Sequence, residues 1–238
     1  MMLRLLLVVI SIGLATSPAS AQVDQFLKSM GIGQQSSLPD VKVDAGLKQA
    51  LQVATEKSVS LTGRPNGYFS NQAIKILMPE KLQTVESGLR MVGYGPQVDE
   101  FVLSMNRAAE QAAPAAKKIF TDAITGITFD DAKKILSGGN TSATEFFKAK
   151  TTDHLTVAFR PVVDKTMAQT GVMQQYQGLM GRFDAIPFVR SRTFDIDGYV
   201  VGKALDGLFH VIGEQETLIR TNPAARTTEL LREVFATK

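Results

Sequence analysis

The sequence predicts an all-α protein, an irregular multi-helix bundle of roughly eight to ten helices with no substantial sheet. Three observations lead to this prediction. From residue 44 onward, nearly every apolar run repeats at the three- and four-residue spacing of a helix that buries one face. Proline and glycine residues divide these runs where helices begin and end. Apolar residues make up 44% of the 238 residues and charged residues 21%, which is ordinary usage for a globular chain.

The first 21 residues are predicted to be a signal peptide. Arg4 precedes an apolar run over residues 5–14, and the small residues Ala19, Ser20 and Ala21 follow. This run is about half of the ~20 apolar residues that a transmembrane helix needs. We therefore expect cleavage after Ala21, an exported, periplasmic protein, and no membrane-spanning segment in the mature chain.

Residues 22–43 are predicted to form a flexible N-terminal segment with one short helix, because a stretch rich in Gly and Ser follows a small apolar cluster. A single helical domain is predicted over residues 44–238. Its first helix has Asp44 as a plausible N-cap and ends at Gly63. Residues Ile74 to Met78 alternate like a short strand without a partner, so strand, helix and loop all stay open for them.

Proline residues begin the next three predicted helices, at Pro79, Pro96 and Pro114. In the second of these helices, Leu103 lies opposite the main apolar stripe, which predicts that this helix has neighbours on two sides. A short helix follows, with Thr128 and Asp131 in a capping box.

The next predicted helix is capped by Thr141 or Ser142 and is kinked or ended by Pro161. A further segment runs from there to residue 170. Residues 183–189 are apolar without a helical period and are predicted to be a loop lying on the body of the protein. A long helix then carries apolar residues from Val201 to Ile219, and residues 222–223 are predicted to begin the terminal helix.

Composition excludes several classes of function. The chain has no cysteine and two histidines, which leaves out disulfides, thiolate nucleophiles and Cys-ligated metal centres. The formal net charge is only +3, so the basic patch of a nucleic-acid-binding protein is not expected. No nucleotide-binding loop of the Gly-Lys-Ser/Thr type and no Gly-x-Ser-x-Gly elbow is present. We expect no cofactor.

Asp206, His210 and Glu214 are the sharpest metal-ligand pattern in the chain. They stand four residues apart on the long C-terminal helix and form one stripe of three candidate ligands. The simpler interpretation is the solvated face of that helix, with Lys203 one turn before Asp206. A metal site also needs ligands from another element, so we expect no metal.

Gly139, Thr141 and Thr144 are candidate anion-binding residues. They place flexible backbone and hydroxyl groups at a helix N-terminus, where free N–H groups and the helix dipole attract a phosphate or carboxylate. The structural alternative, a glycine C-cap followed by a threonine N-cap, accounts for the same residues and is favoured.

Asn106, Arg107 and Glu110 are candidate ligand-binding residues on the helix that begins at Pro96. If this side of the helix is buried, the three groups must be hydrogen-bonded or must line a cleft. The functional interpretation is a polar pocket. The favoured structural interpretation is an internal network with Arg90 or Asp122 as partners.

The chain resembles the bacterial family called domain of unknown function 4197. The resemblance covers nearly the whole mature chain and is carried by residues 77–82, 106–110, 129–136, 138–141, 205–209, 219–226, 230–231 and 234–235. It implies a mainly helical, exported or envelope-associated protein with no assigned reaction. It also implies an apolar residue where His210 stands, which weakens the metal interpretation.

Three functional hypotheses remain open from the sequence. The first is a non-enzymatic exported protein of the cell envelope that binds an envelope protein or a small ligand. The second is a metal-independent enzyme that uses the Glu110 carboxylate in a polar cleft. The third is a carrier of an apolar ligand or lipid, which needs a large apolar cavity. The sequence does not determine the oligomeric state.

Overall fold

The computed structural model describes residues 40–169, 177, 178, 181 and 194–235. All regular elements in these residues are helical, which confirms the all-α prediction. The predicted signal peptide, residues 22–39 and the predicted apolar loop at 183–189 lie outside the described residues. The helices are α2 (Asp40–Gly63), α3 (Gln83–Met91), α4 (Gly95–Ala112), α5 (Ala116–Thr125), α6 (Phe129–Ser137), α7 (Ser142–Gln169), α9 (Ile196–Thr221) and α10 (Glu229–Phe235).

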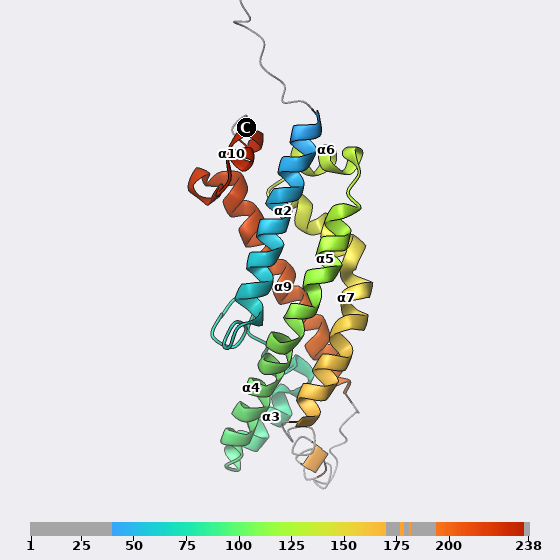
Figure 1. Ribbon diagram of the computed structural model, residues 1–238. Coiled ribbons are helices and arrows are strands. Elements are labelled where there is room, and N and C mark those ends of the chain that lie inside the picture. Colours follow the sequence, from blue (N-terminus) through green and yellow to red (C-terminus); the bar gives the residue numbers. More distant parts are fainter. Residues whose placement is uncertain (1–39, 170–176, 179–180, 182–193, 236–238) are drawn as a thin grey trace, which may run out of the picture. The chain divides into compact units, whose positions relative to one another are not determined.

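Three 3₁₀ turns join these helices, η1 (Glu80–Leu82), η2 (Ala113–Ala115) and η3 (Pro223–Ala225). Figure 1 shows α4, η2 and α5 following one another along one path, with the turn at the predicted helix start, Pro114. Across the part of the chain that is described, no helix is both long enough and apolar enough to cross a membrane.

Helix α9 is central to the core, because it packs against α7, α2 and α4 (Figure 1). The apolar face predicted for this helix is buried throughout. Its buried members include Val201, Ala204, Leu205, Leu208 and Ile212. The opposite side of the helix stays exposed, and the predicted stripe lies on it.

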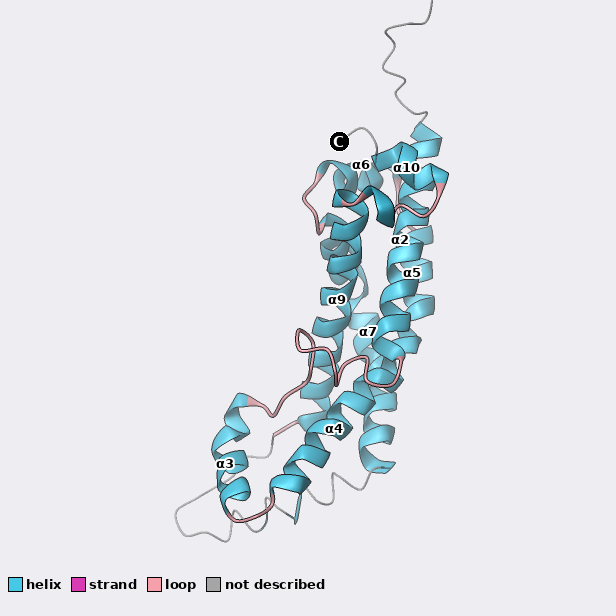
Figure 2. Ribbon diagram, turned by 90° about the vertical axis from the view of Figure 1, so that its left-hand side faces the viewer, coloured by secondary structure: helices cyan, strands magenta, loops and turns pink. Residues whose placement is uncertain are grey.

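Helix α4 also packs on several sides, against α7, α9, α2 and α3, as the position of Leu103 predicted. Figure 2 shows α3 beside α4, and the two meet through the turn at Gly93, whose φ is +92°. A positive φ of this size is readily adopted only by glycine. Gly93 therefore permits the reversal of the chain between the two helices.

The first helix begins earlier than predicted. Helix α2 starts at Asp40, so Asp44 is inside the helix and forms an ion pair with Lys48 at 3.1 Å. Helix α10 packs against α2, and in the added turn Lys42 Nζ lies 3.8 Å from Glu233 Oε2 of α10. The end of the helix at Gly63 is as predicted.

Pro161 does not end its helix. Helix α7 runs without interruption from Ser142 to Gln169, so of the two outcomes predicted for Pro161, a kink or an end of the helix, the end is wrong. Proline removes one backbone hydrogen bond and crowds the carbonyl of residue 157. Both Pro161 and Val157 are exposed, and water can reach that carbonyl. Packing of Phe159 and Val163, both fully buried, holds the helix across the proline.

The terminal helix begins later than predicted. The Asn222 side chain accepts a hydrogen bond from the Ala224 N–H and caps only the turn η3. Helix α10 begins at Glu229, where the Thr228 hydroxyl accepts a hydrogen bond from the Leu231 N–H at 3.2 Å.

Candidate functional site

The exposed face of α9 lines two adjoining pockets, which share Asp206 and His210. We call the two together the α9 groove. Helix periodicity produces this arrangement, because Tyr199, Lys203, Asp206, His210 and Glu214 recur every three or four residues on the side opposite the buried face.

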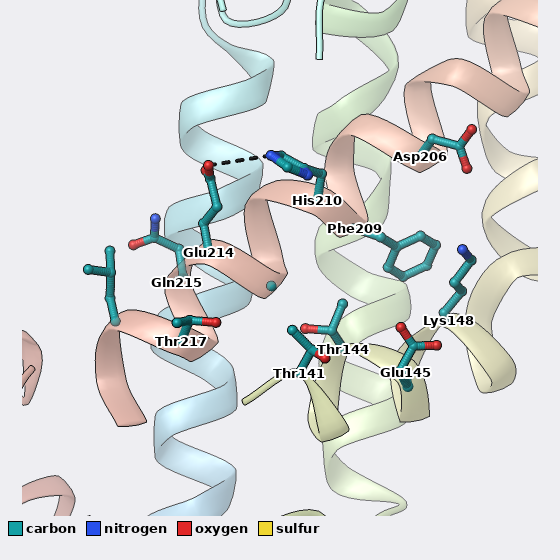
Figure 3. A pocket seen from close by; sticks show the side chains of 12 residues that line it. Thr141, Thr144, Glu145, Lys148, Asp206, Phe209, His210, Glu214, Gln215 and Thr217 are labelled. Atoms are coloured by element: carbon teal, nitrogen blue, oxygen red, sulfur yellow. Dashed lines mark ion pairs between the residues drawn. The ribbon is translucent and has the colours of Figure 1, made fainter. Parts of the chain in front are cut away.

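The first pocket, of about 820 Å³, lies between α9 and the N-terminal part of α7. We call it the acidic pocket, because three of its four formally charged side chains are carboxylates. Figure 3 shows Phe209 pointing from α9 toward α7, where Glu145 and Lys148 lie. The pocket is lined by Thr141, Thr144, Glu145, Lys148, Asp206, Phe209, His210, Gly213, Glu214, Gln215, Thr217 and Leu218.

The second pocket, of about 790 Å³, lies between α9 and residues 73–83. We call it the basic pocket, because three of its five charged side chains are lysines. Its lining includes Lys75, Leu77, Glu80, Lys81, Phe194, Tyr199 and Lys203, besides Asp206 and His210.

Contacts within the groove use only part of its charge. His210 Nε2 lies 3.4 Å from Glu214 Oε1 (Figure 3), and Lys203 Nζ lies 3.8 Å from Asp206 Oδ2. These side chains are about half exposed, so such pairs contribute only about 0–1 kcal/mol. They can therefore open at low cost and interact with a ligand.

Tyr199 forms the wall of the basic pocket. Its ring centroid lies 5.8 Å from that of Phe194, and its hydroxyl donates to the Leu77 carbonyl oxygen at 3.0 Å. Burial and the nearby Glu80 carboxylate raise the pKa of Tyr199. Its hydroxyl therefore stays protonated as a donor, and this fixes residues 73–83 against α9.

The predicted anion position at the start of α7 is filled by the chain itself. Glu216 of α9 accepts hydrogen bonds from the N–H groups of Ala143 and Thr144, at 2.9 and 2.8 Å, and from the Thr144 hydroxyl at 2.7 Å. This carboxylate supplies the cap that was predicted for Thr141 or Ser142. Thr141 and Thr144 line the acidic pocket, whereas Gly139 is exposed and is not among its lining residues.

Asn106, Arg107 and Glu110 hold residues 64–79 against α4. Glu110, only 3% exposed, accepts hydrogen bonds from the N–H groups of Tyr68 and Phe69 at 3.1 and 3.2 Å. Arg107 donates to Glu110 at 2.6 Å. None of the three side chains is among the lining residues of the groove.

The predicted partners of this network were wrong. Arg90 pairs with Glu86 of its own helix and with Asp99 at the start of α4, and Asp122 pairs with Lys118. The actual partners are backbone groups and the Asn66 side chain of the loop before α3, 30 to 42 positions away in sequence, which helix periodicity cannot indicate.

Residues 74–78 are held in place by the side chain of Asn106. Its side-chain amide accepts a hydrogen bond from the Ile76 N–H at 2.9 Å and donates to the Ile76 carbonyl at 2.7 Å. One side chain thus makes the two bonds that a neighbouring strand would make. The segment is a loop that follows a turn ending at Ile74, with Ile74, Ile76 and Met78 buried.

The stripe of Asp206, His210 and Glu214 on α9 does not form a metal site in the part of the chain that the structure describes. No group of three or more His, Asp or Glu side chains within the described residues is close enough to hold a metal ion. His210 forms an ion pair with Glu214, and Asp206 forms one with Lys203.

Comparison with known families supports the resemblance in the sequence. The family model described as a protein of unknown function, DUF4197, matches residues 37–236. The chain belongs to the DUF4197 family. No curated protein and no solved structure matches it. All residues that line the α9 groove lie within the matched range, and the interpretation of the groove depends on its own chemistry.

Sequence reasoning identified Thr141, Thr144, Asp206, His210 and Glu214 but did not place them together. The structure brings all five to the acidic pocket. Residues of the basic pocket were missed, because Lys75, Lys81 and Phe194 carry no motif. The available signal was the exposed stripe on α9, which indicated a polar face but not what stands opposite it.

Proposed function

We propose that this protein is a non-enzymatic, exported protein of the bacterial cell envelope that binds a small polar ligand in the α9 groove. The observation that carries the proposal is the pair of adjoining pockets that share Asp206 and His210. Pockets of roughly 300–1,000 Å³ with apolar walls and a few polar groups are typical small-molecule sites. Export is supported by the signal-peptide pattern of residues 1–21.

Ligand binding is favoured over catalysis, because Glu110 is not free to act as a general acid or base. Both oxygens of that carboxylate are engaged, Oε1 by two backbone N–H groups and Oε2 by Arg107. A general acid or base must reach the proton that it transfers. Glu110 instead organises the loop that forms one wall of the basic pocket.

Carriage of an apolar ligand has no comparable support. A pocket with mainly apolar walls, between α2 and α9 and lined by Leu47, Leu51 and Ile219, has a volume of only about 10 Å³. This is the space of about one water molecule.

Native mass spectrometry of the exported protein tests the proposal. We expect the wild type to carry a small ligand and the variant His210→Trp to lose it, because His210 stands where the two pockets meet. His154→Trp on α7 is the matched control, since His154 is also exposed and lines a separate pocket outside the groove. Absence of a bound ligand in the wild type, or equal retention by both variants, would overturn the proposal.

The same sample tests export. N-terminal sequencing should begin at Gln22, the residue after the Ala19-Ser20-Ala21 triplet. A soluble protein that retains Met1 would contradict the predicted export.

A further inference from the structure

The two ends of the α9 groove carry opposite charge. Apart from Asp206, which both pockets share, Glu145 and Glu214 outnumber Lys148 in the acidic pocket. In the basic pocket, three lysines (Lys75, Lys81 and Lys203) outnumber Glu80. Glu145, Glu214 and Lys81 are exposed, so their charges are accessible from the groove. A ligand that fits the whole groove therefore needs a positive group at one end and a negative group at the other.

The separation of these charges sets the length of the ligand. Glu214 and Lys203 are eleven positions apart on α9, which is about 16 Å at the helical rise of ~1.5 Å per residue. An extended peptide advances ~3.3 Å per residue. Four to six peptide residues, with the reach of their side chains, therefore span the distance.

Gln215 provides a partner for a peptide backbone. Its side chain lines the acidic pocket beside Glu214 (Figure 3) and is 8% exposed. No hydrogen bond of its side-chain amide is found to any residue that the structure describes. Its oxygen and nitrogen are not among the fully buried side-chain atoms that lack a partner, so solvent or a ligand in the groove can reach a donor and an acceptor on this amide.

The protein already contains the interaction that Gln215 would make. Asn106 binds both the N–H and the carbonyl of Ile76 through one side-chain amide. A carboxamide is matched in geometry to a single peptide unit, because both carry one N–H donor and one C=O acceptor in a plane. Gln215 presents the same group to a ligand in the groove.

We propose that the α9 groove binds a short extended peptide, with a positive group held by Glu145 and Glu214 and a negative group, four to six positions away, held by Lys81 and Lys203. The inference rests on the proposed function, and it adds the chemical class of the ligand. The aromatic side chains Phe209 and Tyr199 provide apolar contact for the part of the peptide between the charges.

Titration of the mature protein with designed peptides, followed by NMR chemical shifts, tests the inference. The probe is Lys-Ala-Ala-Ala-Glu with acetylated and amidated ends, whose two charges lie on one face of an extended chain. Saturable shifts are expected at Asp206, His210 and Gln215. The uncharged peptide Gln-Ala-Ala-Ala-Gln should bind at least tenfold more weakly.

Variants of the groove give a second measurement. Glu214→Gln and Lys203→Gln should each weaken binding of the charged peptide by about tenfold without changing the melting temperature. Glu100→Gln and Lys117→Gln are matched controls, because both side chains are exposed and neither lines the groove. These controls should bind like the wild type.

The outcomes separate this inference from the proposed function. Equal affinity for the charged and uncharged peptides, or shifts outside the groove, would overturn the peptide assignment. If neither peptide binds while the natural ligand is still lost in His210→Trp, the groove binds another class of ligand and only the peptide inference fails. If no natural ligand is found either, both fail.

Discussion

The Glu216 carboxylate accepts two hydrogen bonds from Thr144, one from its backbone N–H at 2.8 Å and one from its hydroxyl at 2.7 Å. Glu216 and Arg220 are both about 6% exposed and lie 2.8 Å apart. Arg220 also donates to the carbonyl of Ile135 in α6. A single buried ion pair therefore joins α9 to the start of α7 and the end of α6.

Replacing Glu216 should strongly destabilise the protein. Glu216→Ala leaves the Arg220 charge buried without its partner and the N–H groups of Ala143 and Thr144 without an acceptor. Breaking one side of a buried pair costs about 3–5 kcal/mol in the free energy of unfolding. Urea denaturation measures the loss. Glu214→Ala, at an exposed position two residues away, should change stability by less than about 0.5 kcal/mol, and equal losses in both variants would contradict this role for Glu216.

Glu110→Ala should also destabilise the protein, because it leaves the buried N–H of Tyr68 and the part-buried N–H of Phe69 without an acceptor. Unsatisfied buried donors cost about 1–3 kcal/mol. The comparison is Glu100→Ala, an exposed acid on the same helix, which should be nearly neutral. Thermal melts distinguish the two. A melting temperature for Glu110→Ala at or above the wild-type value would show that this carboxylate is held at a stability cost, as at a functional site.

The helices could be predicted from the sequence because their signals are local. The capping box of Thr128 and Asp131 formed as predicted, and Asp195 caps α9 through the Gly198 N–H. Helix ends failed where packing decides them. Helix α2 extends to Asp40, where Lys42 pairs with Glu233 of α10. Helix α7 continues through Pro161, because Phe159 and Val163 on either side of it are buried by distant residues.

The candidate site could be predicted only in pieces. The stripe of Asp206, His210 and Glu214 follows from helix periodicity, but the segments opposite it, at residues 73–83 and at the start of α7, are fixed by long-range hydrogen bonds. Glu216 shows the limit most clearly. The sequence indicated free N–H groups at the start of α7, yet nothing near Thr144 indicated a carboxylate 72 positions away.

Two glycines of α9 should respond in opposite ways to alanine. An added Cβ at Gly207 would meet Tyr68 Cε1 at 2.6 Å and Ile74 Cβ at 3.0 Å, whereas Gly202 has open space around it. Overpacking costs about 1–3 kcal/mol, so Gly207→Ala should lower the melting temperature. Gly202→Ala should raise stability by up to about 1 kcal/mol, because alanine favours the helix. Calorimetry of both variants checks the pair, and a stabilised Gly207→Ala would refute the close approach of residues 68–74 to α9.

Asp197 and Asp195 should respond in opposite ways to pH. Burial, with repulsion from Asp164 and Asp195, raises the pKa of Asp197, and its Oδ1 has no hydrogen-bond partner within the described residues. In contrast, the Gly198 N–H and Arg160 lower the pKa of Asp195. Folding therefore makes Asp197 harder to ionise, and Asp195 easier to ionise, than in the unfolded chain.

Asp197→Asn should consequently be more stable than the wild type at pH 7. A raised pKa in the folded state means that ionisation opposes folding at pH values above it, and this penalty disappears below the unfolded value of about 3.9. The advantage of Asp197→Asn should thus shrink as the pH falls toward 4. Asp195→Asn should instead be less stable than the wild type at pH 7, with a deficit that also shrinks on acidification. Melting temperatures between pH 3.5 and 7 test both signs, and an Asp197→Asn variant that is no more stable than the wild type at pH 7 would show that its carboxylate is not penalised at the start of α9.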